Sequence, residues 1–328
     1  MCKEGGSMEM AREKLLHLFE KMVQTRYFEE TTERLNREKK ISGSVHTSIG
    51  EEATAVGAAA ALREGDYLSA SYRDLGCLFE RGFEPLEIAG MLYAKACGAT
   101  NGRTRVLHVG SLEKHVLPAN PILGASAAIA IGAALANKKD RNGLVTLNMF
   151  GDGASNEGAV HESMNFAAVF QLPIVFVIKN NRYAWSTPTE KIIPAPILAD
   201  RAKAYGFPGY LANGNDVLDV CETVSRAVED ARAGKGPSLV ECRTYRVSGH
   251  SGNDKNVYRT RNEIIRWKQD CPIRKLEGYI TEAGFAGQDE IDEIRFRVQQ
   301  TVNEAITQAA CAPDPDVDTL LSEQQMIC

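Results

Sequence analysis

The sequence predicts an α/β fold built on a doubly wound, mostly parallel sheet, with helical extensions at its N- and C-terminal ends. Residues 144–150 and 174–178 are apolar runs of the length of buried strands, and residues 156–170 between them have the length and composition of a helix. Such a strand–helix–strand unit places its two strands parallel in one sheet. From residue 124 onward helical and strand patterns alternate regularly, which is typical of this fold class.

The first part of the chain is predicted to be helical, apart from one long loop. Residues 8–37 form an amphipathic pattern with an apolar face made of Leu15, Leu16, Phe19, Met22 and Val23. Residues 47–61 are rich in small side chains suited to close helix packing, and residues 85–96 predict another helix. Residues 98–122 contain several glycines and prolines, and a loop of this length inside a domain is usually functional.

The rest of the chain continues the alternation and then becomes mostly helical. The small-residue stretch 124–136 predicts a buried helix, and residues 248–258 form a polar loop. Further helices are expected over 197–205 and 217–233, and further strands over 209–213 and 238–247. We see no repeat and no linker, so we expect residues 1–328 to form one domain. Its parts are a helical segment (about 8–62), an α/β core (about 63–260) and a helical extension (about 261–328) with a proline-rich tail near residue 313.

The composition excludes several classes of protein. The chain has 328 residues, of which 44% are hydrophobic and 25% charged, and this is typical of a soluble globular protein. A formal net charge of −5 without a basic block argues against binding to nucleic acid. No apolar run reaches the roughly 18 residues of a membrane helix, and charged residues near the N-terminus interrupt any secretory signal. The eight cysteines are scattered without C-x-x-C spacing, which favours free thiols and a cytoplasmic protein over disulfides or a zinc site.

Oxygen-bearing side chains follow both strands of the predicted unit. Gly151-Asp152-Gly153 comes directly after the first strand, and Asn180-Asn181 ends the second. Alone, each is an ordinary turn, but the carboxyl ends of parallel strands lie side by side, where open α/β folds bind ligands. A carboxylate and an amide oxygen with room for phosphate oxygens suit magnesium, and the backbone N–H groups of Gly153 and Ala154 can hold phosphate. The pair therefore predicts a magnesium-bridged diphosphate cofactor.

These motifs resemble the thiamine diphosphate and magnesium motif of a known family. The run from Gly151 to Pro188 resembles, more narrowly, the alpha subunit of the decarboxylating component of 2-oxo acid dehydrogenase complexes, of the pyruvate and acetoin type. The resemblance covers nearly the whole chain. Its other motifs are His46-Thr47 with Gly50-Glu51-Glu52-Ala53, Tyr72-Arg73, Asn215-Asp216-Val217, and Gly249-His250-Ser251 with Tyr258-Arg259.

The resemblance implies roles for individual residues around thiamine diphosphate and Mg²⁺. Asp152 and Asn181 would supply side-chain oxygens to the metal, and Tyr183 its backbone carbonyl. The cofactor-binding residues implied are Tyr72, Arg73, Leu123, Asp152, Gly153, Ala154, Asn181 and His250. Arg73 offers a fixed charge and a fork of donors for phosphate.

Two histidines are the predicted catalytic residues. His250 lies in the polar loop and His46 in a Gly-Ser-Val-His-Thr segment, and both can be poised near neutral pH for proton transfer. His17, His161 and His115 are expected to be structural or surface residues, and His108 is a weaker candidate.

The resemblance also implies a reaction and partners. The family removes carbon dioxide from a 2-oxo acid and passes the acyl group to a lipoyl group, so a lipoyl acyltransferase component is an expected partner. A beta subunit supplies a needed glutamate, and two alpha and two beta subunits share the active sites. Two alternatives remain open: a branched-chain or specialised-pathway 2-oxo acid dehydrogenase alpha subunit, and a non-catalytic diphosphate-binding regulatory homologue.

Two departures from the family pattern leave the identity of the substrate open, and the modification of one serine is a separate open question. Residues 103–107 replace a Gly-Gly-Ser-Met segment of many relatives, and Pro121 stands where many have glycine. Ser251 lies at a position that is phosphorylated in some relatives.

Overall fold

A five-stranded parallel sheet forms the centre of the protein. The computed structural model describes residues 2–319, with side chains from residue 11 onward. The strands lie in the order β1 (Tyr67–Ser69), β2 (Thr146–Gly151), β3 (Ile174–Asn180), β7 (Ser238–Arg243) and β6 (Gly209–Asn213). Every neighbouring pair in this sheet is parallel, which confirms the predicted fold class.

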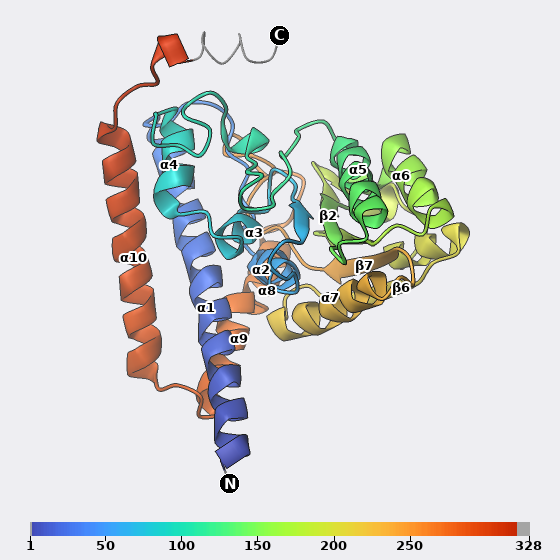
Figure 1. Cartoon of the computed structure of the whole chain (residues 1–328). Coiled ribbons are helices and arrows are strands. Elements are labelled where there is room, and N and C mark those ends of the chain that lie inside the picture. Colours follow the sequence, from blue (N-terminus) through green and yellow to red (C-terminus); the bar gives the residue numbers. More distant parts are fainter. Residues whose placement is uncertain (1, 320–328) are drawn as a thin grey trace.

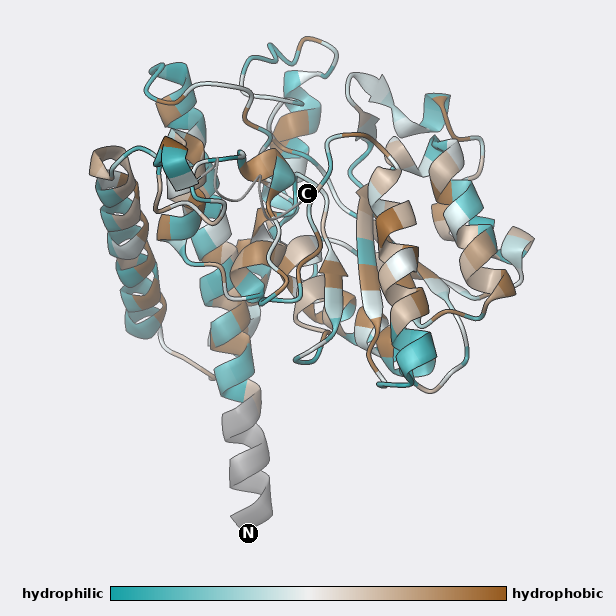
Figure 2. Ribbon diagram, turned by 45° about the horizontal axis from the view of Figure 1, so that its top comes forward, coloured by the Kyte–Doolittle hydropathy of each residue, from teal (hydrophilic) through white to brown (hydrophobic). Residues whose placement is uncertain are grey.

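Both faces of the sheet are covered by helices, and its central strands are buried on both sides. In β3, Ile174, Phe176 and Ile178 belong to one buried cluster, whereas Val175 and Val177 belong to the other. This alternation is the two-residue period of a strand that is buried on both faces. The first cluster includes side chains of α5 (Ala125–Asp140), α6 (Gly158–Val169) and the 3-10 helix η4 (Leu198–Tyr205). The second includes side chains of α2 (Glu52–Ala59), α3 (Leu75–Glu80) and α7 (Val217–Arg232), and Figure 2 shows the two helical layers.

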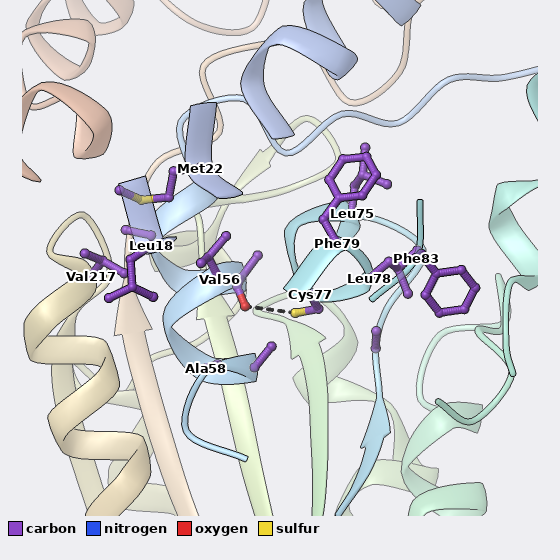
Figure 3. Packing of buried hydrophobic residues seen from close by; sticks show 14 of the residues in the cluster. Leu18, Met22, Val56, Ala58, Leu75, Cys77, Leu78, Phe79, Phe83 and Val217 are labelled. Atoms are coloured by element: carbon purple, nitrogen blue, oxygen red, sulfur yellow. Dashed lines mark hydrogen bonds between the residues drawn. The ribbon is translucent and has the colours of Figure 1, made fainter. Parts of the chain in front are cut away.

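The N- and C-terminal helices pack together beside the sheet. Figure 1 shows α1 (Cys2–Arg37) and α10 (Gln288–Cys311) running side by side, near α4 (Pro85–Tyr93) and α9 (Pro272–Glu282). Leu18 and Met22 of α1 lie in the same apolar cluster as Val56 of α2 (Figure 3). The cluster therefore continues from the sheet into the helical extensions. The remaining α-helix, α8, spans Arg261–Gln269.

Several predicted boundaries are wrong, each for a local reason. The helix predicted from residue 47 begins only at Glu52, because the chain makes a turn at Gly50 with a positive φ of 98°. The strand predicted over 238–247 ends at Arg243, and residues 197–205 are a 3-10 helix rather than an α-helix. Two short elements were not predicted from the sequence: α3, and β1, a strand of three residues.

The predicted irregular stretch over 98–122 is confirmed. Within it the structure has one short 3-10 helix, η1 (Val106–His108), and an isolated antiparallel bridge between Ser111 and Val116. The remaining short elements are η2 (Ala154–Asn156), η3 (Thr189–Lys191) and the two-stranded ribbon of β4 (Tyr183–Ala184) and β5 (Thr187–Pro188).

Two predictions drawn from composition can be compared with the described residues. Cys77, Cys97, Cys221, Cys242, Cys271 and Cys311 are free thiols, as predicted. The side chains of Cys2 and Cys328 lie outside the described part. Among the described helices, none combines the length and the apolar character needed to span a bilayer.

Candidate cofactor and active site

Three neighbouring strands end in one row at the carboxyl edge of the sheet. Gly151 of β2 is in register with Lys179 of β3, and Lys179 is in register with Cys242 of β7. Asp152 and Asn181 therefore emerge next to each other, as the crossover predicted. The segment that follows β7 leads from the same edge to His250. A site at this edge receives side chains from three parts of the chain.

A cleft of about 510 Å³ opens at this edge, within the range of small-molecule and cofactor sites. All ten predicted site residues line it: His46, Tyr72, Arg73, Leu123, Asp152, Gly153, Ala154, Asn181, Tyr183 and His250. The lining also includes three exposed apolar side chains, Ile122 (67% exposed), Trp185 (66%) and Leu123 (45%). The structure thus brings the predicted residues together, while their individual roles stay predictions.

Asp152 is a buried carboxylate at the floor of the cleft. One of its oxygens accepts from the backbone N–H of Gly153 at 2.8 Å, and the other accepts from the hydroxyl of Thr189. Burial raises the pKa of its carboxyl, although these hydrogen bonds oppose the change. A cation beside it would relieve this cost, so the surroundings of Asp152 fit a metal ion.

The other two predicted metal ligands are neutral oxygens. The Nδ2 of Asn181 donates to Glu51 at 3.1 Å, which leaves its Oδ1 with one partner, the N–H of Tyr183 at 3.3 Å. Among the described residues, no group of three or more His, Cys, Asp or Glu side chains could hold a metal ion. A metal in this cleft would therefore be held by one carboxylate and neutral oxygens, which is a donor set for magnesium rather than zinc.

Two buried arginines converge on the same cleft. Arg73 donates to the carbonyl of Thr47 at 2.7 Å and to that of His250 at 2.9 Å. Arg246 donates to the carbonyl of Trp185 at 2.7 Å, but in the described structure its buried Nε has no hydrogen-bond partner. A Cβ added at Gly153 would lie only 2.8 Å from that of Ala184, so the turn at Gly153 leaves room only for a bare backbone. Two guanidinium groups and a bare backbone turn fit a diphosphate.

His250 lies between the two arginines. Its Nδ1 is 3.3 Å from Arg73 and 3.5 Å from Arg246, and its ring stacks on Trp185 with centroids 4.6 Å apart. Because both guanidinium groups are donors only, Nδ1 accepts and the proton of the neutral ring is on Nε2. Burial and the two positive charges lower the pKa of His250 to about 3. The expectation that His250 titrates near neutral pH is therefore wrong for the chain without a bound anion.

His46 is held in place by the same loop. Its Nδ1 lies 2.9 Å from the carbonyl of His250, so Nδ1 carries the proton, and its Nε2 lies 3.0 Å from the hydroxyl of Ser44. Its ring contacts those of Tyr72 and His250 edge to face. Burial, with the charge of Arg73, lowers the pKa of His46 as well. Both pKa values are therefore below that of a free histidine, which favours the neutral form of both rings at neutral pH.

The cleft also contains side chains that were not predicted from the sequence, among them Lys179, Trp185 and Arg246. Arg246 follows a buried strand at the carboxyl edge, and the rule that identified Asp152 and Asn181 could have identified it. The charged residue Lys179, which directly follows the apolar run 174–178 within β3, was a second signal. Trp185 gave no signal, because its place depends on a left-handed turn at φ 54°.

The other four histidines lie away from the cleft lining. His17 pairs with Glu80 at 2.9 Å, and His161 contacts the hydroxyl of Tyr205 at 2.5 Å. The ring of His115 packs edge to face on that of Tyr67. His108, the weaker candidate, is exposed at the end of η1.

The departures at 103–107 and Pro121 have visible consequences. Arg105 donates to both the carbonyl and the hydroxyl of Ser42, which ties this loop to the segment that leads to His46. Pro121 lines the cleft beside Ile122.

The buried carboxylate of Glu29, behind the His46 segment, should make the stability of the fold depend on pH. This carboxylate of α1 is buried and accepts from the N–H and the hydroxyl of Ser48. Burial raises its pKa to about 8, against roughly 4.3 for an unfolded chain. The folded chain therefore holds this proton more tightly, and its contribution to stability is lost as the pH rises from about 4 to about 8.

We expect the Tm of Glu29→Gln to rise relative to that of the wild type as the pH increases, with the smallest difference at pH 5 and the largest at pH 9. Calorimetry at pH 5, 7 and 9 measures this, with the exposed Glu64→Gln as control. A variant less stable than the wild type at pH 9 would show that the ionised carboxylate stabilises the fold.

Comparison with known proteins agrees with this geometry. Residues 20–318 match the family described as the dehydrogenase E1 component. The chain is 35% identical to the alpha subunit of acetoin:2,6-dichlorophenolindophenol oxidoreductase of Bacillus subtilis, over 98% of this chain and 96% of that protein. It is 35% identical to the alpha subunit of the pyruvate dehydrogenase E1 component of Rhizobium meliloti, over 97% and 92% of the two chains. It is also 35% identical to the 2-oxoisovalerate dehydrogenase alpha subunit of Bacillus subtilis, over 94% of each chain.

The match covers most of the chain, including every strand of the sheet and all ten residues predicted to form the site. The family implies the use of thiamine diphosphate, and the relatives named above are alpha subunits, which implies a partner subunit. The resemblance inferred from the motifs is confirmed, and the chain belongs to the dehydrogenase E1 component family.

Proposed function

We propose that this chain is the alpha subunit of a thiamine diphosphate-dependent 2-oxo acid dehydrogenase. The reaction is the oxidative decarboxylation of pyruvate, or the cleavage of acetoin, with transfer of the acyl group to a lipoyl group. The observation that carries the proposal is the convergence in one cleft of a buried carboxylate (Asp152), an amide (Asn181) and two buried arginines (Arg73 and Arg246). Such a set fits a metal-bound diphosphate, because the oxygens suit Mg²⁺ and the guanidinium groups suit phosphate.

The chain's own residues hold the cofactor and control its surroundings. Asp152, Asn181 and the carbonyl of Tyr183 hold Mg²⁺, and Arg73, Tyr72 and Arg246 hold the diphosphate. When bound, thiamine diphosphate supplies the carbon nucleophile and the electron sink for loss of carbon dioxide. Leu123 gives the cofactor an apolar contact.

The two histidines orient the substrate and move protons. In the chain without an anion, the proton of His250 is on Nε2, and Nδ1 is fixed by two guanidinium groups. A bound diphosphate would neutralise part of that positive charge and bring the pKa of His250 back toward its ordinary value. His46 has its Nε2 against the hydroxyl of Ser44, a short path for a proton.

The cleft mouth supports a shared active site. Ile122, Trp185 and Leu123 are exposed there, and exposed apolar side chains around a cleft are typical of an interface. We propose that a beta subunit covers this mouth in an assembly of two alpha and two beta subunits, which delivers acyl groups to a lipoyl acyltransferase component. Residues 1–328 would act in it as one domain.

Co-expression with a beta subunit tests the proposed function. The purified pair is assayed with thiamine diphosphate, Mg²⁺ and an artificial electron acceptor, on pyruvate, acetoin and branched 2-oxo acids. We expect turnover of pyruvate or acetoin by the pair, none by the alpha chain alone, and none by a pair carrying Asp152→Ala. The exposed Asp200→Ala variant is the matched control. Equal activity of the alpha chain alone would contradict the shared site, and turnover of branched substrates alone would change the substrate class.

A further inference from the structure

Lys179 is a buried charge beneath the cofactor cleft. It stands at the carboxyl end of β3, is 1% exposed, and lies two residues before Asn181. The five residues before it in the strand are apolar. Placing an ammonium group among apolar side chains is unfavourable unless it is paired, so its partners indicate why it is there.

The ammonium group of Lys179 contacts three acceptors from two other segments. It pairs with Glu51 at 3.0 Å and with Asp74, and it donates to the carbonyl of Arg73 at 3.2 Å. The side chains of both carboxylates are completely buried. The ammonium group donates hydrogen bonds to Asp74 and to the carbonyl of Arg73, whereas its contact with Glu51 is an ion pair, because Oε2 of Glu51 accepts no hydrogen bond within the described residues.

Each carboxylate holds a different half of the predicted cofactor site. Glu51 uses its other oxygen to accept from Nδ2 of Asn181 at 3.1 Å, which turns the amide so that Oδ1 is the atom left for a metal. Asp74 accepts from the N–H of Ser71 at 2.8 Å and so closes the turn that carries Tyr72 and Arg73. One chain of contacts thus runs from the metal ligand through Lys179 to the phosphate-binding turn.

We propose that Lys179 is a positioning residue that couples the metal-binding half of the site to its phosphate-binding half. The proposal rests on the proposed function. Without the ammonium group, Glu51 and Asp74 are two buried carboxylates with no cation between them, and they repel each other. Glu51 then no longer fixes the Asn181 amide, and Asp74 no longer fixes the turn of Arg73. Loss of Lys179 should therefore weaken metal and diphosphate binding together.

The test compares three variants in the assembled alpha–beta enzyme: Lys179→Met, Lys179→Arg, and the exposed Lys203→Met as control. Calorimetric titration measures the affinity for thiamine diphosphate with and without Mg²⁺. We expect Lys179→Met to lower the Mg²⁺-dependent affinity by about 10- to 100-fold, the usual effect of losing a partner of a metal ligand. The factor by which Mg²⁺ tightens cofactor binding should fall as well. Lys179→Arg should recover part of both, and Lys203→Met should behave as the wild type.

A triple variant separates the role of Lys179 in positioning the site from its role in folding. In Lys179→Met with Glu51→Gln and Asp74→Asn, the buried cluster is neutral and of nearly unchanged size, so this triple variant should fold if Lys179→Met alone does not. We expect it to regain thermal stability but not Mg²⁺-dependent cofactor affinity. Wild-type affinity for thiamine diphosphate and Mg²⁺ in Lys179→Met or in the triple variant would overturn the role of Lys179. A wild-type enzyme that binds no thiamine diphosphate would instead overturn the proposed function.

Discussion

Asp152→Asn should make the chain without cofactor more stable and, at the same time, unable to hold its cofactor. Asparagine has the shape of the carboxylate: its Oδ1 can accept from the N–H of Gly153, and its Nδ2 can donate to the hydroxyl oxygen of Thr189, so the fold should be unchanged. Because burial raises the pKa of Asp152, its stabilising protonated form is lost as the pH rises, and at neutral pH the folded chain holds an unfavourable buried charge. Asparagine removes that charge at every pH.

The two effects differ in size and in pH dependence. At neutral pH the Tm of the variant should exceed that of the wild type, by roughly 2–4 °C for each kcal/mol gained, and the difference should vanish at low pH, where the wild-type carboxyl is protonated. The loss of cofactor affinity should exceed about 100-fold, since even partners of a metal ligand contribute 10- to 100-fold. Asp152 is the only charged group among the three predicted metal ligands.

Calorimetry of the chain without cofactor from pH 3 to pH 8 measures the first effect, and titration with thiamine diphosphate and Mg²⁺ measures the second. The exposed Asp200→Asn should change neither. A lower Tm in Asp152→Asn would show that the carboxylate is already stabilised by its neighbours, and an unchanged affinity would remove Asp152 from the metal site.

Gly50→Ala should be among the most destabilising single substitutions in the chain. Gly50 has φ 98°, and a Cβ there would lie 2.6 Å from the carbonyl oxygen of Tyr245 and 2.7 Å from a methyl group of Val247. A backbone carbonyl in a packed segment cannot move away easily. The neighbouring Ile49 carbonyl accepts from the N–H of Val247 at 2.9 Å, so the clash acts where the His46 segment meets the His250 segment.

Gly82→Ala is the matched control, because Gly82 also has a positive φ, 84°, but a Cβ added there would meet no atom within 4 Å. Left-handed backbone alone costs about 1 kcal/mol for alanine, which is the expected loss in Gly82→Ala. We expect Gly50→Ala to lose about 3 kcal/mol or more and to bind cofactor weakly. Urea unfolding of both variants measures the difference. Equal losses would show that the clash at Gly50 is relieved by movement of the loop.

The elements with a clear local pattern of apolar residues could be predicted from the sequence, and those defined by contacts with distant segments could not. β2 and β3 are buried on both faces and mostly apolar, so their runs stand out, and the polar residues after them identify Asp152 and Asn181. β1 has three residues, and its backbone is paired with β2 far along the chain, which leaves no local signal. The end of β7 at Arg243 is likewise set by where its neighbours end.

Ten of the residues that line the cleft could be predicted from motifs, but the charge states of its histidines could not. Motifs placed His250 in the site, yet its pKa depends on Arg73 and Arg246, which reach it from two different segments. Arg246 was missed, and with it the reason why His250 is neutral. Charge states depend on which groups meet in space, and spacing along the chain does not reveal that.

The exposed apolar rim of the cleft has a consequence for the cell that makes this chain. Ile122, Trp185 and Leu123 surround the mouth, and until a partner covers them they can attach to other exposed apolar surfaces. A surplus of this subunit over its partner would then be lost to self-association and proteolysis. In the proposed assembly, balanced synthesis of the two subunits would therefore limit the loss of this chain, because a partner would cover these three side chains.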